Sequence, residues 1–268
     1  MTTGTADRPT AFTARARREE IARLVEEDER VSVGELTERF HVTDASIRRD
    51  LMILEDAGRL RRVHGGAVAR LDARARGTYS TKQREHREQK ARIGAAAAGL
   101  IRAGDVVFFD SGTTVAQVAA HVPAVLRRAG AITAVTHSLP VVDEIGDWES
   151  PHLICLGGLY LPEYQAVVGP QTVAGLRELS ADVVFLGCDG LSVDAGLTTP
   201  HMLVAEVGAT MASRSRRVVA VADSSKIGRQ GFTPIVPLAA IQVLITDDAA
   251  DPVEVERLRR LGIEVILA

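Results

Sequence analysis

From residue 93 onward, continuous apolar runs alternate with segments of helical periodicity, and this alternation restricts the fold more than any other feature of the chain. Strands are expected at Val106–Phe109, Ile132–Thr136, Leu153–Leu156, Val183–Leu186, Val218–Ala222, Val243–Ile245 and Val265–Leu267. Helices are expected between most of them, at Thr114–His121, Leu139–Ile145, Thr172–Leu179, Met202–Arg214 and Pro252–Leu261. Strands that are apolar on both faces are typical of parallel sheets covered by helices on both sides. The pattern predicts a doubly wound, mostly parallel α/β sheet.

Small polar residues follow most of these strands directly. Doubly wound sheets bind their ligands at the carboxyl ends of the strands. The run 110–114 follows the first strand and opens a helix, whose free N–H groups and dipole favour an anion. We therefore predict a phosphate-binding edge at these strand ends. Its candidate residues are Asp110, Ser111, Gly112, Thr113, Thr114, Thr136, His137, Ser138, Gly157, Gly158, Asp189, Gly190 and Lys226.

Three charged residues of this edge have separate expected roles. Lys226 is a natural second charge for a phosphoryl group. Asp110 and Asp189 suit hydrogen bonds from sugar hydroxyls, and structural capping is the alternative for each of them. Because a Ser or Thr cap on any helix resembles the run 110–114, the prediction depends on five polar strand ends meeting at one edge.

A separate N-terminal module has three expected helices. The first covers residues 14–27, the second begins at the capping-box spacing of residues 32–35, and the third is capped by Thr43. The third helix is expected to bury the residues at i, i+4 and i+7 spacing, which are Ile47, Leu51 and Leu54.

The opposite face of the third helix carries Arg49, with Arg48 on its flank. A guanidinium fork at Arg49 suits guanine in the major groove, and the lateral Arg48 suits a backbone phosphate. The alternative is a solvated face on which these arginines pair with Asp44 or Glu55. The turn before the helix and the basic hairpin after it favour DNA contact.

A glycine-marked hairpin is expected after the third helix. Gly58 would end the helix, and residues 59–63 and 67–70 would form two strands around the turn 64–66. An arginine-rich hairpin of this kind is a wing, which adds salt-sensitive contacts to the DNA backbone. The layout predicts a winged helix-turn-helix that binds double-stranded DNA. The candidate DNA contacts are Thr43, Ala45, Ser46, Arg48, Arg49, Arg59, Arg61, Arg62, His64 and Gly65.

The positive charge of the chain is concentrated rather than general. The 268 residues have a formal net charge of −3, yet residues 59–76 hold six arginines and a single acidic residue. A local patch is what focused DNA contact requires. Arginine outnumbers lysine 29 to 3, an excess that indicates a GC-rich genome and carries no mechanistic prediction.

Several classes of protein are excluded by what the sequence lacks. No run approaches the apolar length of a membrane span, and the polar start has no secretory core, so a cytoplasmic location is expected. Cys155 and Cys188 lie in apolar strand-like runs without metal-ligand spacing, which predicts two reduced core cysteines. We expect neither a metal, nor a cofactor, nor a catalytic residue.

The chain divides into four expected regions. These are a polar tail at residues 1–13, the winged helix-turn-helix at 14–70, a linker at 71–88 and an effector-binding domain at 89–268. The charged residues of the linker are expected to be solvated.

The chain resembles the DeoR family of bacterial transcription regulators over nearly its whole length. The matching runs are 30–33, 46–51, 60–67, 110–114, 156–158, 168–170, 189–190, 196–200 and 222–226. The resemblance implies a winged helix-turn-helix joined to a sugar-phosphate sensor whose fold is similar to ribose-5-phosphate isomerase and coenzyme A transferases. It also implies repression of an operon for carbohydrate uptake or catabolism, relieved by a phosphorylated intermediate. Lys90 falls where such sensors commonly carry a lysine near the ligand.

Three positions depart from the family pattern. His137 stands where asparagine is usual, so ligand choice or affinity is expected to differ. Gly208 replaces a frequent lysine and removes one possible phosphate contact, and Cys188 replaces a small residue such as alanine.

The expected function is therefore that of a non-enzymatic repressor, released from its operator by a phosphorylated sugar or sugar alcohol. Two-fold operators favour a dimer or tetramer. The alternative is a sugar-phosphate isomerase with an accessory DNA-binding head, for which Asp189 would be the base. No acid-rich cluster surrounds Asp189 in the sequence, which counts against an enzyme.

Overall fold

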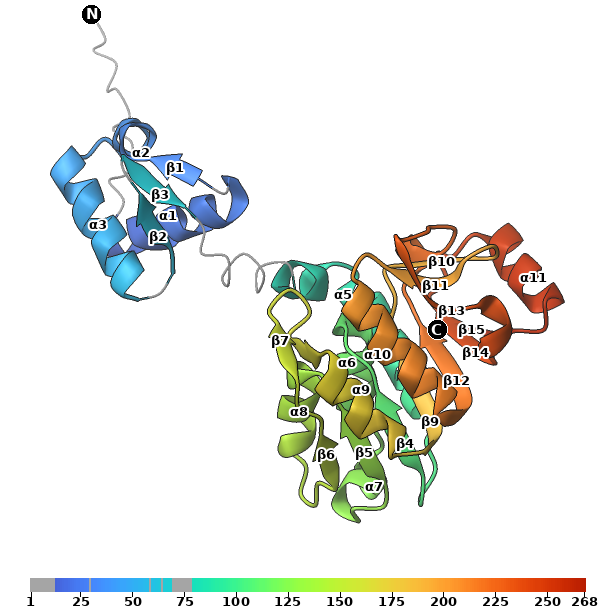
Figure 1. The fold of residues 1–268 in the computed structure, drawn as a ribbon. Coiled ribbons are helices and arrows are strands. Elements are labelled where there is room, and N and C mark those ends of the chain that lie inside the picture. Colours follow the sequence, from blue (N-terminus) through green and yellow to red (C-terminus); the bar gives the residue numbers. More distant parts are fainter. Residues whose placement is uncertain (1–12, 29, 58, 64, 69–78) are drawn as a thin grey trace, which may run out of the picture. The chain divides into compact units, whose positions relative to one another are not determined.

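A computed structural model describes residues 13–28, 30–57, 59–63, 65–68 and 79–268 (Figure 1). The chain divides into two compact units, Met1–Gly77 and Thr78–Ala268. The second half of the expected linker, residues 79–88, therefore belongs to the second unit. Within the described residues, no helix has the length and apolarity that crossing a membrane requires.

The described residues of the first unit form three helices and a small antiparallel sheet. The helices are α1 (Ala14–Asp28), α2 (Val33–Phe40) and α3 (Asp44–Asp56), as predicted. The strands β1 (Arg30–Ser32), β2 (Arg61–Val63) and β3 (Gly66–Val68) pair in the order β1-β3-β2. The hairpin was predicted, but β1 was not, because a three-residue strand is too short to show a periodicity. Gly58, expected to end α3, lies outside the described residues.

The predicted capping box of α2 is confirmed. The Ser32 hydroxyl accepts a hydrogen bond from the Glu35 backbone N–H at 3.2 Å, and the Glu35 carboxylate accepts one from the Ser32 N–H at 2.8 Å. Ile47, Leu51 and Leu54 are buried as expected. The opposite face of α3 is thereby left outside the core of this unit.

The second unit is built on a seven-stranded parallel sheet, as predicted. Its order is β15-β14-β12-β9-β4-β5-β6, and every neighbouring pair is parallel. The strands are β4 (Val106–Phe109), β5 (Thr133–Thr136), β6 (Leu153–Cys155), β9 (Ala181–Leu186), β12 (Ser215–Val221), β14 (Val243–Thr246) and β15 (Glu264–Leu267).

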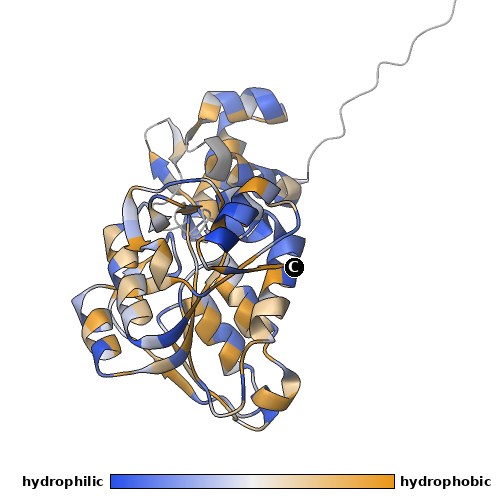
Figure 2. Ribbon diagram, turned by 90° about the vertical axis from the view of Figure 1, so that its right-hand side faces the viewer, coloured by the Kyte–Doolittle hydropathy of each residue, from blue (hydrophilic) through white to orange (hydrophobic). Residues whose placement is uncertain are grey.

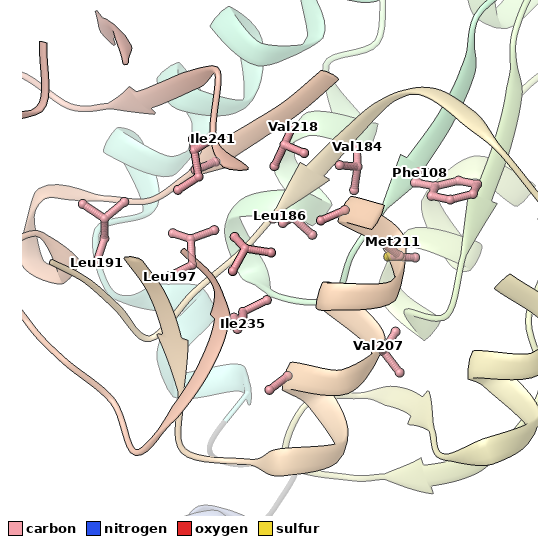
Figure 3. Close-up of a cluster of buried hydrophobic side chains, with 14 of the residues drawn as sticks. Phe108, Val184, Leu186, Leu191, Leu197, Val207, Met211, Val218, Ile235 and Ile241 are labelled. Atoms are coloured by element: carbon pink, nitrogen blue, oxygen red, sulfur yellow. The ribbon is translucent and has the colours of Figure 1, made fainter. Parts of the chain in front are cut away.

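Helices cover both faces of this sheet. On one face lie α5 (Arg87–Ala98), α6 (Thr113–Ala120), α7 (Ala124–Arg128) and α8 (Leu139–Gly146), against a cluster that includes Val107 and Phe109. On the other lie α9 (Pro170–Arg177), α10 (Met202–Ser213) and α11 (Pro252–Arg260), against a cluster that includes Phe108 (Figure 3). Consecutive residues of one strand thus enter different cores, which is why these strands are apolar throughout. Figure 2 shows this concentration of apolar residues in the sheet and its helices.

Several shorter elements lie at the carboxyl edge of the sheet. The hairpin β7 (Leu159–Leu161) and β8 (Ala166–Val168) follows β6. A second small sheet joins β10 (Gly190–Ser192), β11 (Gly196–Thr199) and β13 (Thr233–Val236). Single turns of 3-10 helix lie at η1 (Ser224–Lys226) and η2 (Leu238–Ala240). None of these short elements was predicted.

The strand order reverses between β4 and β9. From β4 the chain moves outward through β5 and β6, and it then returns to β9 on the other side of β4 before moving outward through β12, β14 and β15. The connections leaving β4 and β9 therefore diverge and open a crevice at the carboxyl ends of these two strands. Residues 110–114 and 187–189 follow these strands directly.

The prediction for the two cysteines was half wrong. Cys155 is exposed on β6, an edge strand of the sheet, because only one side of that strand has a neighbour. Cys188 is half-buried after β9, where its pKa is raised to about 12 by burial. Both cysteines are free thiols.

Candidate functional site

The exposed face of α3 presents the paired arginines. Arg48 and Arg49 are both exposed, and Arg48 lies 3.9 Å from Asp44 in an ion pair at the surface. Within the described residues, Arg49 has no ion pair with an acidic side chain. The Thr43 hydroxyl accepts a hydrogen bond from the Ser46 N–H at 3.3 Å, which fixes the start of the helix. Arg49 is thus available to a ligand outside the unit.

The wing arginines are partly engaged with acidic side chains of the same unit. The carboxylate of Glu55 accepts hydrogen bonds from the backbone N–H and the Nε of Arg62, at 2.9 and 2.7 Å, and these bonds lower the pKa of Glu55. Glu55 is therefore occupied by the wing rather than by Arg48 or Arg49. Arg59 forms an ion pair with Glu19 at 3.4 Å.

The remaining predicted DNA contacts have different standing. Gly65 lies in the turn with a φ of +79°, a conformation that favours glycine. Ala45 is exposed on α3. His64 and the side chain of Arg61 lie outside the described residues, so their DNA contacts stay predictions.

A cleft opens in the second unit at the crevice between β4 and β9. It contains about 680 Å³ of space that protein atoms do not fill, part of it open to solvent. Its lining residues are Tyr79, Lys82, Lys90, Asp110, Ser111, Gly112, Thr113, Thr114, Glu163, Tyr164, Gly187, Cys188, Asp189, Thr199, Val204, Val221, Ala222, Asp223, Lys226 and Ile235.

All three lysines of the chain line this cleft. Arginine outnumbers lysine 29 to 3 in the sequence, yet Lys82, Lys90 and Lys226 meet at one place. An ammonium group is compact and carries three rotatable donors, so it can bind partners that lack the planar geometry a guanidinium fork matches. The same lining holds four acidic residues, Asp110, Glu163, Asp189 and Asp223, so the lysines supply cationic donors rather than a net positive charge, beside a helix start that favours an anion.

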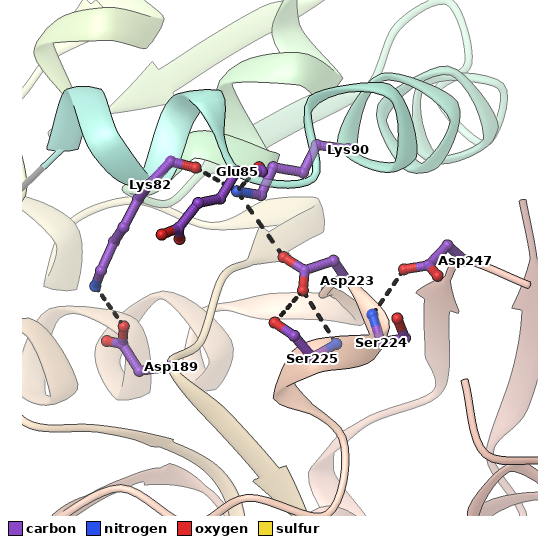
Figure 4. Close-up of polar contacts among 8 residues, drawn as sticks. All are labelled: Lys82, Glu85, Lys90, Asp189, Asp223, Ser224, Ser225 and Asp247. Carbon is purple, nitrogen blue, oxygen red and sulfur yellow. Dashed lines mark hydrogen bonds and ion pairs between the residues drawn. The ribbon is translucent and has the colours of Figure 1, made fainter. Parts of the chain in front are cut away.

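Lys90 of α5 is the most deeply buried of the three cations. Only 4% of the residue is exposed, and Nζ donates to the carbonyl oxygens of Lys82 and Glu85, to the latter at 2.8 Å (Figure 4). A carboxylate oxygen of Asp223 lies 3.9 Å away. Burial lowers the pKa of Lys90, and the nearby Asp223 carboxylate partly opposes that shift.

The loop after β12 is held in place by two buried carboxylates. Asp223 caps η1 by accepting hydrogen bonds from the backbone N–H of Ser225, at 3.1 Å, and from its hydroxyl. Asp247 accepts one from the Ser224 N–H at 2.7 Å (Figure 4). Burial acts to raise the pKa of Asp247, but the hydrogen bonds from Ser224, Ala249 and its own backbone together outweigh it, and the pKa is lowered. The loop therefore presents Lys226 from a fixed turn.

Asp189 forms the other polar side of the cleft. One of its carboxylate oxygens accepts from Lys82 Nζ at 2.6 Å, and the second accepts from the Thr199 hydroxyl at 3.0 Å. The Tyr164 hydroxyl lies 3.5 Å from the same second oxygen, and Lys82 Nζ lies 5.6 Å from the centre of the Tyr164 ring. Burial raises the pKa of Tyr164 to about 12, so its hydroxyl is protonated.

Asp110 is positioned by the two strands that bound the crevice. One of its oxygens accepts from the Gly187 N–H at 3.1 Å, and the other lies 3.0 Å from Nε2 of His137. The next glycine, Gly112, has a φ of +117°, and a Cβ there would meet open space. Glycine is thus required by backbone conformation rather than by packing, and it turns the chain directly into α6.

Several residues predicted to bind the effector lie beneath or beside the cleft rather than in its lining. Thr136, His137 and Ser138 are fully buried. The β7–β8 hairpin covers the ends of β5 and β6: the Val167 N–H donates to the His137 carbonyl at 2.9 Å, and His137 Nδ1 lies 2.7 Å from the Val167 carbonyl. Gly157, Gly158 and Gly190 are likewise absent from the lining.

The expectation that five polar strand ends would share one edge is therefore corrected. The ends of β4, β9 and β12 meet in the cleft, whereas the β7–β8 hairpin covers those of β5 and β6. His137 still acts on the site, because its ring orients Asp110. Eight of the residues predicted to bind the effector do line the cleft: Lys90, Asp110, Ser111, Gly112, Thr113, Thr114, Asp189 and Lys226.

Sequence reasoning missed Tyr79, Lys82 and Tyr164, of which Lys82 was expected to be solvated. The scarcity of lysine was a usable signal, since the three positions could have been grouped on that ground alone. The departure at Gly208 has a packing reason: a Cβ there would come within 2.7 Å of the Ile235 side chain.

Two family models match the two units. The DeoR-like helix-turn-helix domain matches residues 17–71, and the DeoR C terminal sensor domain matches residues 85–248. The chain belongs to the DeoR family. The winged module and the parallel sensor sheet are thus the fold that the resemblance predicted.

Curated relatives of this DeoR-family chain are transcriptional regulators. The HTH-type transcriptional regulator GlpR of Haloferax volcanii is 35% identical, over 93% of this chain and 96% of that protein. The transcriptional repressor AccR of Agrobacterium fabrum is 32% identical, over 86% and 88%. Among solved structures, ribose 5-phosphate isomerase A of Methanocaldococcus jannaschii has a TM-score of 0.40 and 16% identity, over 53% of this chain and 55% of that one.

Family and relatives agree with the prediction that the chain is a transcription regulator rather than an enzyme. Its helix-turn-helix implies DNA binding, and its sensor domain implies a small-molecule effector. Within the described residues, no three His, Cys, Asp or Glu side chains are grouped so as to hold a metal ion.

Proposed function

We propose that this chain is a repressor of an operon for carbohydrate uptake or catabolism, released from its operator by a phosphorylated sugar or sugar alcohol. The observation that carries the proposal is the gathering of all three lysines of the chain in one cleft. A phosphoryl group needs such charge, and the carboxylates in the same cleft suit the hydroxyls of a carbohydrate. No cofactor takes part in this function.

The cleft has two chemically different sides, which fit the two ends of such a ligand. Lys90, Lys226 and the start of α6 form the side for the phosphoryl group. Asp189, Thr199 and the Tyr164 hydroxyl form a hydrogen-bonding side for sugar hydroxyls. A phosphorylated carbohydrate matches both sides, whereas inorganic phosphate matches only the first.

The exposed arginines of α3 supply the DNA-reading half of the proposal. Arg49 suits a guanine in the major groove, and Arg48 suits a phosphate. Relatives of the chain support repression in particular, since they include the transcriptional repressor AccR. We propose a dimer or tetramer as the DNA-bound form, because operators read by helix-turn-helix proteins are two-fold symmetric.

The proposal is tested by a thermal-shift screen of the full chain against phosphorylated sugars, phosphorylated polyols and their unphosphorylated forms. A hit is then added to the chain bound to the promoter of a neighbouring carbohydrate operon. We expect a phosphorylated compound to raise the melting temperature and release the DNA, and its unphosphorylated form to do neither. In Lys226→Ala, operator binding should persist without release. Normal release in that variant, or the absence of any phosphorylated hit, contradicts the proposal.

A further inference from the structure

The helical residues 79–84 stand at the cleft, although they were expected to belong to a solvated linker. Tyr79 and Lys82 both line it. Arg84, in the same turn of chain, is exposed and does not line it. This stretch, called here the entry segment, begins the described part of the second unit.

Tyr79 brings an unused hydroxyl to the cleft. Only 7% of the residue is exposed, and its hydroxyl is buried without a hydrogen-bond partner among the described residues. Burial raises the pKa of Tyr79 to about 12, so the group keeps its proton and is a donor at neutral pH. A buried hydroxyl without a partner is uncommon, because it has lost water and gained nothing in return. A polar ligand in the cleft would supply the missing partner.

Lys82 is paired with the Asp189 carboxylate, to which a carbohydrate hydroxyl would donate a hydrogen bond. Its Nζ lies 2.6 Å from Asp189, and the two side chains keep 37% and 23% of their surface exposed. Ion pairs of such exposure are weak and exchange readily. A ligand hydroxyl that binds this oxygen of Asp189 competes directly with the Lys82 ammonium.

Lys90 links the phosphate side of the cleft to the entry segment. An ammonium has three N–H donors, and two of those of Lys90 go to the carbonyls of Lys82 and Glu85 (Figure 4). Asp223 lies near the third at 3.9 Å. An anion that binds Lys90 therefore competes for the N–H donors that Lys90 now gives to the carbonyl oxygens of Lys82 and Glu85.

We propose that the effector binds the entry segment directly. It hydrogen-bonds the Tyr79 hydroxyl, displaces Lys82 from Asp189 and draws Lys90 from the two carbonyls, so that the segment leaves the position described above. The Lys82–Asp189 ion pair belongs to the operator-binding form. This proposal rests on the proposed function, since it names the residues that couple effector binding in the same cleft to operator binding.

The test uses the full chain, a 79–84 variant set and phosphorylated probes: ribose 5-phosphate, fructose 1-phosphate, glucose 6-phosphate and glycerol 3-phosphate. Tyr79→Phe removes a buried hydroxyl that has no partner, so the ligand-free melting temperature should stay the same or rise. The dissociation constant of the probe that binds should rise about tenfold, as expected for one lost hydrogen bond in a cleft. Arg84→Gln is the matched control and should change neither quantity.

Lys82→Gln is tested without any probe. Because it breaks the ion pair of the operator-binding form, operator affinity should fall by up to about fivefold, the most that an ion pair of this exposure contributes. Arg84→Gln removes the same charge from the same segment and should leave operator affinity unchanged. A Tyr79→Phe chain that binds its probe like the unaltered chain, or a Lys82→Gln chain that binds operator like Arg84→Gln, overturns the inference. If none of the probes binds the unaltered chain, the proposed function fails instead. The Lys82→Gln measurement needs no probe, so it still tests the role of the ion pair in operator binding.

Discussion

The two units use positive charge in opposite ways. The first presents guanidinium groups on an exposed helix face, with Arg48 and Arg49 open to solvent. The second gathers ammonium groups in a cleft, where Lys90 is only 4% exposed. Within the described residues, no lysine lies outside that cleft.

This difference follows from what each cation can bind. A guanidinium is a planar fork that keeps its charge and matches base edges and phosphates at a wet surface. An ammonium is compact and carries three rotatable donors, so backbone carbonyls can bind it, as they do at Lys90. In a chain that otherwise uses arginine so heavily, all three lysines lie at the sensor cleft.

The largest expected effect comes from removing the buried cation. Lys90→Met should weaken binding of a phosphorylated effector by about 2–5 kcal/mol, because it deletes one partner of a desolvated charge contact. Isothermal titration calorimetry measures the loss. The matched control is Arg92→Met, two residues along α5, whose ion pair with Asp248 is exposed. It should bind the effector normally, and equal losses in both variants would show that burial at Lys90 has no special role.

A smaller effect is expected at the exposed arginine that faces DNA. Arg49→Ala should cost about 1–3 kcal/mol at the contacted base and abolish discrimination between operator and unrelated DNA. Competition binding with both duplexes measures it. Its effector-induced thermal shift should remain that of the unaltered chain. Retained discrimination means that another side chain reads the sequence.

The smallest effect is expected at the neighbouring arginine. Arg48 is 61% exposed at its side chain and already paired with Asp44, so Arg48→Ala should weaken all duplexes alike by less than about 1 kcal/mol. The slope of log affinity against log salt should fall by about one, since a single phosphate contact is lost. Salt titrations on operator and unrelated DNA check both points. A loss confined to the operator would instead assign base recognition to Arg48.

The sequence predicted the elements that have strong local signals. Seven apolar runs became the seven strands of the parallel sheet, and the capping-box spacing at Ser32 marked the start of α2. Such features are determined by periodicity and by contacts within a few residues. The short strands β1, β7 and β10 were missed, because their pairing depends on distant partners rather than on their own composition.

Only the part of the cleft formed by residues that directly follow strands was predicted from the sequence. Asp110 and Asp189 were placed correctly at the carboxyl edge, but the predicted site was too wide, because the β7–β8 hairpin covers part of that edge. Residues 136–138 and 157–158, at the ends of β5 and β6, do not line the cleft. Tyr79 and Lys82 carried no local sign of their location, because only the folded chain brings the entry segment back to Asp189.

Whether the effector binds in this cleft is tested most directly by amine-selective acylation of the full chain. Mass spectrometry then measures the labelling of Lys82, Lys90 and Lys226. A phosphorylated carbohydrate that releases the operator should raise the labelling of Lys82, which loses its Asp189 partner, and lower that of Lys226, which the phosphoryl group covers, while its unphosphorylated form should change neither. Operator release with unchanged labelling at both lysines would contradict this mechanism, because the effector would then act from some other place.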